Sequence, residues 1–63
     1  MSNVAIIEKQ TEGGSWIKIS ECANKAPQIK MALNAALKAH PNDRKFRAID
    51  SVSKQLLDME INF

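Results

Sequence analysis

The chain has 63 residues, an apolar content of 44% and a formal net charge of +2. This length allows at most one domain, residues 1–63, near the lower limit at which a chain folds alone. A single cysteine, Cys22, excludes an intrachain disulfide, and a single histidine, His40, has no second histidine or cysteine with which to hold zinc. The small charge gives no indication of a nucleic-acid or membrane partner, and the sequence shows no targeting or membrane-spanning segment, so we expect an intracellular soluble protein.

The N-terminal third contains two runs typical of strands. "VAIIEK", residues 4–9, is short, and "SWIKIS", residues 15–20, alternates isoleucine with polar residues. In the second run the alternation places Ile17 and Ile19 on one face and Trp16 on the other. Two interpretations remain open: an N-terminal hairpin with residues 11–14 as its loop, or a single strand at residues 15–20 with residues 1–12 only loosely ordered.

The next segment predicts a helix that ends at about Ala39. Asn24 is a suitable N-cap and Pro27 fits the first turn, while Pro41 disfavours helical backbone at His40. On a helical wheel the polar residues of this segment form one narrow stripe, at Lys30, Asn34 and Lys38. The rest of the circumference is apolar, so we expect this helix to need neighbours on at least two sides.

A second helix is expected from Asn42 or Asp43 to about residue 60. Its apolar residues recur every three or four positions, which forms a wide stripe with charged residues opposite. The expected fold class is therefore α+β, with one short strand, or an N-terminal hairpin, followed by two α-helices.

One such chain cannot cover its own apolar surface, and a lone strand cannot satisfy its own backbone. We therefore expect an intertwined homodimer in which the strand pairs with its copy across a twofold axis. Trp16, the only tryptophan, is expected to lie in the core or the dimer interface, or to line a cleft for a partner helix or peptide. The residues expected to form the dimer or partner interface are Trp16, Ile17, Ile19, Leu33, Leu37, Phe46, Ile49, Val52, Leu56, Met59 and Phe63.

The sequence shows no arrangement typical of catalysis. No elbow motif surrounds a serine and the two glycines are far from a phosphate-binding fingerprint, so we expect no enzyme, no cofactor and no metal. The alternative is a ribbon–helix–helix-like DNA-binding regulator, because strand–helix–helix is the topology of those repressors. In that case Arg44, Lys45 and Arg47 would contact phosphates from the first turns of the second helix, where basic residues oppose the helix dipole. Trp16 on the outward strand face is a poor choice for reading bases.

The whole chain, from "MSNVAIIEKQ" through "KMALNAALKAH" to "DMEINF", resembles a small early protein of lambda-like temperate phages, encoded between the exonuclease and excisionase genes. The resemblance implies an accessory protein that favours lytic over lysogenic development in the host bacterial cytoplasm. It also implies a helical, dimeric fold without known enzymatic activity. We expect the protein to act by binding a host or phage protein. No catalytic or binding residues come with it.

Overall fold

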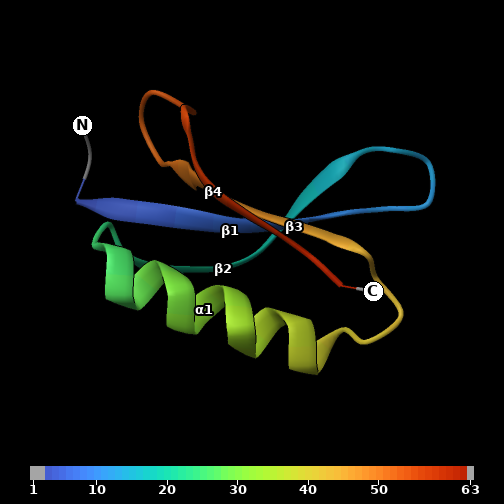
Figure 1. Ribbon diagram of the computed structural model, residues 1–63. Helices are drawn as coiled ribbons and strands as arrows, with labels where there is room; N and C mark the ends of the chain where they lie inside the picture. Colours follow the sequence, from blue (N-terminus) through green and yellow to red (C-terminus); the bar gives the residue numbers. More distant parts are fainter. Residues whose placement is uncertain (1–2, 63) are drawn as a thin grey trace.

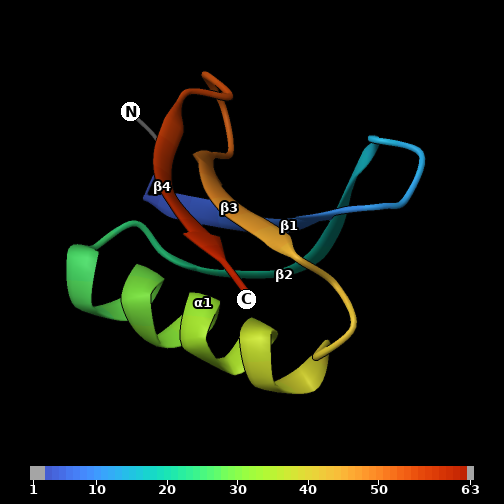
Figure 2. The same cartoon turned by 45° about the vertical axis from the view of Figure 1, so that its right-hand side comes forward.

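The computed structural model describes residues 3–62, which fold as an antiparallel sheet packed against one helix. The elements are β1 (Val4–Gln10), β2 (Trp16–Ala23), α1 (Ala26–Ala39), β3 (Lys45–Asp50) and β4 (Leu56–Ile61). The four strands have the order β2-β1-β3-β4, so β1 and β3 are central and β2 and β4 form the edges. Figures 1 and 2 show α1 lying along one face of the sheet and leaving the other face open.

The N-terminal hairpin is one of the two alternatives that the sequence left open, and the structure adopts it. β1 pairs with β2 in antiparallel register, and the loop between them is closed by Thr11 N–H donating to Ser15 O at 2.7 Å. Gly14 takes a φ of +89°, a conformation that glycine adopts at little cost. The backbone of β2 therefore finds a partner within its own chain, and residues 4–10 form a central strand rather than a loosely ordered segment.

The expected helix is present at its expected end. α1 begins after Lys25, carries Pro27 in its first turn and ends at His40, before Pro41. Asn24 was expected to cap it and does not: its side chain donates instead to Asp50 Oδ1 at 3.3 Å. Within one chain α1 buries Ile29, Leu33 and Ala36 against the sheet, and a neighbour on a second side stays a prediction.

The second expected helix is absent, and with it the predicted fold class is wrong. Residues 45–50 and 56–61 form the hairpin β3–β4, so the described chain is β-β-α-β-β and not one strand with two helices. The three-to-four spacing that predicted a helix is accidental, because "KFRAID" alternates with period two: Phe46 and Ala48 are buried on the helix side and Arg47 faces the opposite side. The intertwined arrangement of the homodimer depended on one strand and two helices, so that arrangement is wrong as well.

The core lies between α1 and the two central strands. Its buried residues, at 0–6% exposure, are Ala5, Ile7, Ile29, Leu33, Ala36, Phe46 and Ala48. Register shifts in β1–β2 and β3–β4 insert an extra residue into each edge strand. These bulges turn Ile19 and Leu57 toward the helix, where both pack against the core. α1 thus covers the central strands on one face of the sheet, which leaves the other face and the two edges as the accessible parts of the sheet.

Candidate functional site

The face of the sheet away from α1 is the open face, and residues from all four strands contribute to it. Directly opposite residues of paired strands share a face. Glu8 of β1 is opposite both Lys18 of β2 and Arg47 of β3, and Arg47 is in turn opposite Met59 of β4. This row crosses the whole sheet on the side that no helix covers in Figure 2. The open face is therefore charged at its centre and apolar toward β4.

Arg47 is held in place at the centre of the open face. Its Nε and one terminal nitrogen each lie 2.8 Å from Glu8 Oε1. Its guanidinium carbon lies 4.2 Å from the centroid of the Trp16 ring, in a cation–π contact. Trp16 is consequently half-buried, with Arg47 lying against its ring. The arginine charge is already compensated inside the chain, and the apolar side chains of β4 beside this pair remain accessible.

The apolar part of the open face follows β4, and we name Leu56, Met59 and Ile61 the β4 strip. Their exposed fractions are 54%, 42% and 43%. They stand opposite Ile49, Arg47 and Lys45 of β3. The acidic residues of β4 point the other way, toward the helix side, because Asp58 is opposite buried Ala48 and Glu60 is opposite buried Phe46. Natural proteins usually protect an edge strand from association with charged residues, proline or a bulge. An edge strand that exposes apolar side chains instead favours association.

The structure divides the predicted interface residues into three groups. Leu33, Phe46 and Ile49 are buried within the single chain, and Ile19 and Leu37 are partly buried against the core. Trp16 is covered by Arg47. Those that remain exposed are Ile17, Val52, Leu56 and Met59. Phe63 lies outside the described residues.

Only Leu56 and Met59 of the predicted set belong to the β4 strip. Ile17 is opposite Lys9 on the helix side, and Val52 lies in the β3–β4 turn. Sequence reasoning missed Ile61, although the alternation of apolar and acidic residues in "LLDMEI" is a period-two signal that could have identified it.

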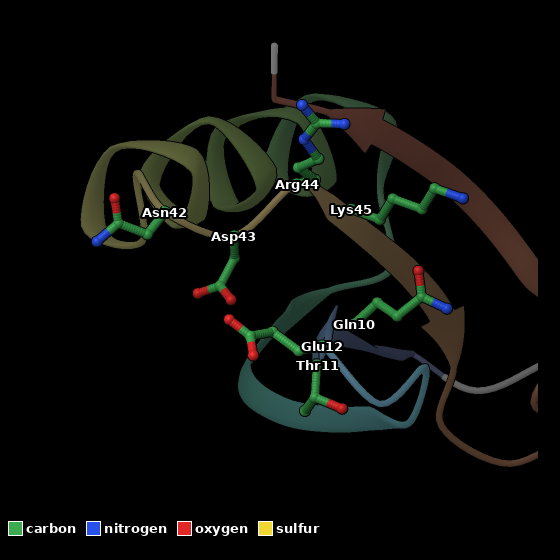
Figure 3. Close-up of a pocket in the computed structure, with 7 residues that line it drawn as sticks. All are labelled: Gln10, Thr11, Glu12, Asn42, Asp43, Arg44 and Lys45. Atoms are coloured by element: carbon green, nitrogen blue, oxygen red, sulfur yellow. The ribbon is translucent and has the colours of Figure 1, made fainter.

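The predicted phosphate contacts do not lie in a helix. Lys45 and Arg47 belong to β3 and Arg44 precedes it. Arg44 and Lys45 help to line a cavity of about 280 Å³ between the β1–β2 loop and the segment before β3. Figure 3 shows the Asp43 and Glu12 carboxylates pointing toward one another while the Arg44 and Lys45 side chains point elsewhere.

Asp43 is already paired in this cavity, with Lys9 Nζ at 2.9 Å and His40 Nδ1 at 3.8 Å from its carboxylate. The cavity therefore presents mixed charge with no convergence of cations, which is not the arrangement that grips a phosphate.

Chemically reactive groups are dispersed over the fold. In the part of the chain described, no three His, Cys, Asp or Glu side chains come together to hold a metal ion. Cys22 is half-buried against the core, and burial raises the pKa of its thiol, which keeps it protonated and poorly nucleophilic at neutral pH. The described residues instead provide surfaces for contact: an apolar strip, a charged centre held by an ion pair, and two strand edges with no neighbouring strand.

Within residues 3–62, the helix is too short to cross a bilayer. No protein-family model matches the chain, and no curated protein or solved structure matches it either.

Proposed function

We propose that this protein is a non-enzymatic interaction protein whose open face binds another protein. The observation that carries the proposal is the β4 strip, in which three large apolar side chains of one edge strand are 42–54% exposed. A contiguous exposed apolar surface beside charged residues is typical of a protein-binding surface. The charged centre formed by Glu8 and Arg47 borders the strip and would set the orientation of a partner.

The resemblance to a small early protein of lambda-like temperate phages supports a biological setting for this activity. In that setting the protein is an early accessory factor that promotes lytic development, and its partner is a host or phage protein in the bacterial cytoplasm. The resemblance covers the whole chain and brings no residue roles with it, so the choice of the β4 strip rests on its exposure.

Exchanging one methionine of the β4 strip tests the proposal. Met59→Gln replaces an exposed thioether with a polar side chain of similar size, and Met31→Gln makes the same exchange on the outer side of α1, where Met31 is 69% exposed. Tagged protein would be recovered from infected bacteria, with the co-purified partner quantified and the time to lysis recorded. We expect Met59→Gln to lose the partner and delay lysis, and Met31→Gln to do neither. Equal behaviour of the two variants would contradict the proposal.

The homodimer is proposed as a side-by-side pair joined along the free edge of β2. The bulge in β1–β2 places both Lys18 and Glu21 on the open face, since they stand opposite Glu8 and Ile6. In an antiparallel pair centred between Ile19 and Ser20, Lys18 of one copy is directly opposite Glu21 of the other. Opposite charges in directly opposed positions stabilise a sheet. Without the bulge these two side chains would lie on opposite faces and could not meet.

The region beside β2 also gives a second copy room to approach. Ile19 and Ser20 border a shallow groove of about 210 Å³ whose helical wall consists of alanines, Ala32, Ala35, Ala36 and Ala39. Small side chains allow two α1 helices to lie close together on the same side of a continuous sheet.

Reversing charges tests this dimer. Lys18→Glu and Glu21→Lys each place like charges opposite one another twice per dimer, so each should weaken association by about tenfold. The double variant restores opposite charges and should recover the affinity of the parent, as measured by sedimentation equilibrium at low salt. If the double variant stays as weak as the single ones, the β2 register is wrong.

DNA is the second candidate partner. The main argument for it was the strand–helix–helix topology, which the fold contradicts. The ribbon–helix–helix alternative needs two helices after the strand, and residues 45–61 form a hairpin instead. Titration of duplex DNA at low and moderate salt checks it, because phosphate contacts give steeply salt-dependent affinity.

A further inference from the structure

The outer edge of β4 has no neighbouring strand among residues 3–62. Asn62 N–H donates to Arg44 O on the β3 side, at 2.6 Å. Because N–H groups alternate in direction along a strand, those of Met59 and Ile61 point to the outer edge. Met59 N–H donates to its neighbour Asp58 Oδ1 at 2.8 Å, and β4 is the last strand of the sheet. A side-chain acceptor thus occupies one position where a further strand would supply a carbonyl.

The two sides of this edge differ sharply in chemistry. The open-face side presents the β4 strip, and the helix side presents the carboxylates of Asp58 and Glu60. The ion pairs among the described residues use Glu8, Glu21 and Asp43, and none involves these two carboxylates. The edge therefore has an alternating pattern of apolar and uncompensated negative side chains.

This pattern disfavours a second copy of the same strand. An antiparallel pair of β4 strands centred on Met59 would put Asp58 of one copy opposite Glu60 of the other, twice. Directly opposed like charges destabilise a sheet. A pair of β2 strands places opposite charges across from one another, and a pair of β4 strands places like charges there. The two edges are therefore suited to different binding partners.

We propose that the β4 edge binds an extended segment of the partner protein as a fifth strand of the sheet. The segment carries lysine or arginine at alternate positions facing Asp58 and Glu60, and apolar side chains at the positions between, facing the β4 strip. In strand addition of this kind, backbone hydrogen bonds provide the affinity and alternate side chains provide the specificity. On binding, a carbonyl of the segment replaces Asp58 as the acceptor for Met59 N–H, which frees the carboxylate for a cation. The inference rests on the proposed function, whose partner class and binding mode it names.

The test uses end-blocked peptides of about eight residues, matched to the length of an edge strand. The first alternates lysine and valine. The second has glutamate in place of lysine, and the third is the lysine peptide with N-methyl groups on the amides that would face β4. Each is titrated into the full-length protein at low salt and followed by backbone NMR. We expect the lysine peptide to shift and protect the amides of Met59 and Ile61, and both other peptides to bind at least about tenfold more weakly.

Two protein variants complete the test. Asp58→Asn with Glu60→Gln removes both charges with little change of shape and should weaken the lysine peptide by about tenfold. Glu12→Gln removes a carboxylate from the β1–β2 turn and should have no effect. Equal binding of the lysine and glutamate peptides, or shifts confined to β2 or α1, overturns strand addition at β4.

The outcome is separable from that of the proposed function. If no peptide binds but Met59→Gln still loses the cellular partner, the open face remains the binding surface and strand addition is wrong. If Met59→Gln keeps its partner in full, the proposed function fails, whatever the peptides do.

Discussion

The Asp50 side chain connects the β3–β4 turn with the segment between β2 and α1. It is fully buried at the end of β3, and its Oδ2 accepts from Val52 N–H at 3.1 Å and Ser53 N–H at 2.8 Å. Its Oδ1 accepts from Asn24 Nδ2, which lies between β2 and α1. A buried carboxylate is tolerated when hydrogen bonds compensate for its desolvation. Asp50 thereby fixes the β3–β4 turn and joins it to the start of the helix.

Replacing Asp50 by alanine should therefore be one of the most destabilising single changes. The variant leaves the donors of the turn and of Asn24 without this acceptor, and we expect a loss of about 2–4 kcal/mol in the free energy of unfolding. Urea denaturation followed by Trp16 fluorescence measures it. Asp58→Ala is the matched control, because among the described residues its carboxylate bonds only to the neighbouring amide, and it should change stability by less than about 0.5 kcal/mol. A small effect of Asp50→Ala would show that the turn forms without its side chain.

At the scale of elements, the helix was predictable and the second hairpin was not. α1 combines a long apolar periodicity with a proline near each end, at Pro27 and Pro41, and these local signals agree. Residues 45–61 fit both the helical and the strand period, so local pattern alone does not separate a helix from a hairpin here. The decisive feature is tertiary: the Asp50 side chain closes a turn at residues 51–55 that no helical pattern contains.

The candidate site was predictable only in part for the same reason. A helical stripe assigns Phe46 and Met59 to one face, whereas in the hairpin Phe46 is fully buried and Met59 is 42% exposed on the opposite side. A bulge at Ala48/Ile49 then shifts the register, which places Leu57 toward the core and Leu56 on the open face. A bulge depends on cross-strand pairing, so neither residue could be placed from local pattern. The sequence contains one signal against the second helix. Arg44 and Lys45 would oppose the dipole of a helix that begins at these residues.

The β3–β4 turn contains a residue in an unfavourable conformation. Lys54 has a φ of +63°, in the left-handed region, and its N–H donates to Asp50 O at 3.0 Å. That region costs a non-glycine residue about 1–2 kcal/mol, of which part is offset by the greater unfolded-state freedom of glycine. Lys54→Gly should therefore stabilise the protein by about 0.5–1 kcal/mol, as measured by urea denaturation. Gly14→Ala makes the opposite change at a φ of +89° and should destabilise it; the same sign for both would refute the argument.

At the scale of the whole molecule, the sheet is covered on one face only and its two edges differ in charge pattern. In the proposed assembly, Lys18 and Glu21 of β2, which pair with each other at 3.0 Å within one chain, would instead pair with those of a second copy, and Asp58 and Glu60 of β4 would face a basic segment. A dimer through β2 would form one continuous sheet with a β4 edge at each end, so each dimer would have two partner sites. Self-association and partner binding could then proceed independently, because they use opposite edges of the same sheet.

If the β2 dimer forms, stability must depend on protein concentration. For a dimer that unfolds to separate chains, each tenfold rise in concentration stabilises the folded state by about 1.4 kcal/mol per mole of dimer. Thermal and urea midpoints should therefore rise with protein concentration and fall as the protein is diluted. Lys18→Glu should flatten this dependence by weakening the dimer, whereas Met59→Gln, on the opposite edge, should leave it unchanged. A midpoint independent of concentration in the parent protein would identify a stable monomer and rule out the β2 dimer. A dependence that Met59→Gln abolishes would move the interface to β4.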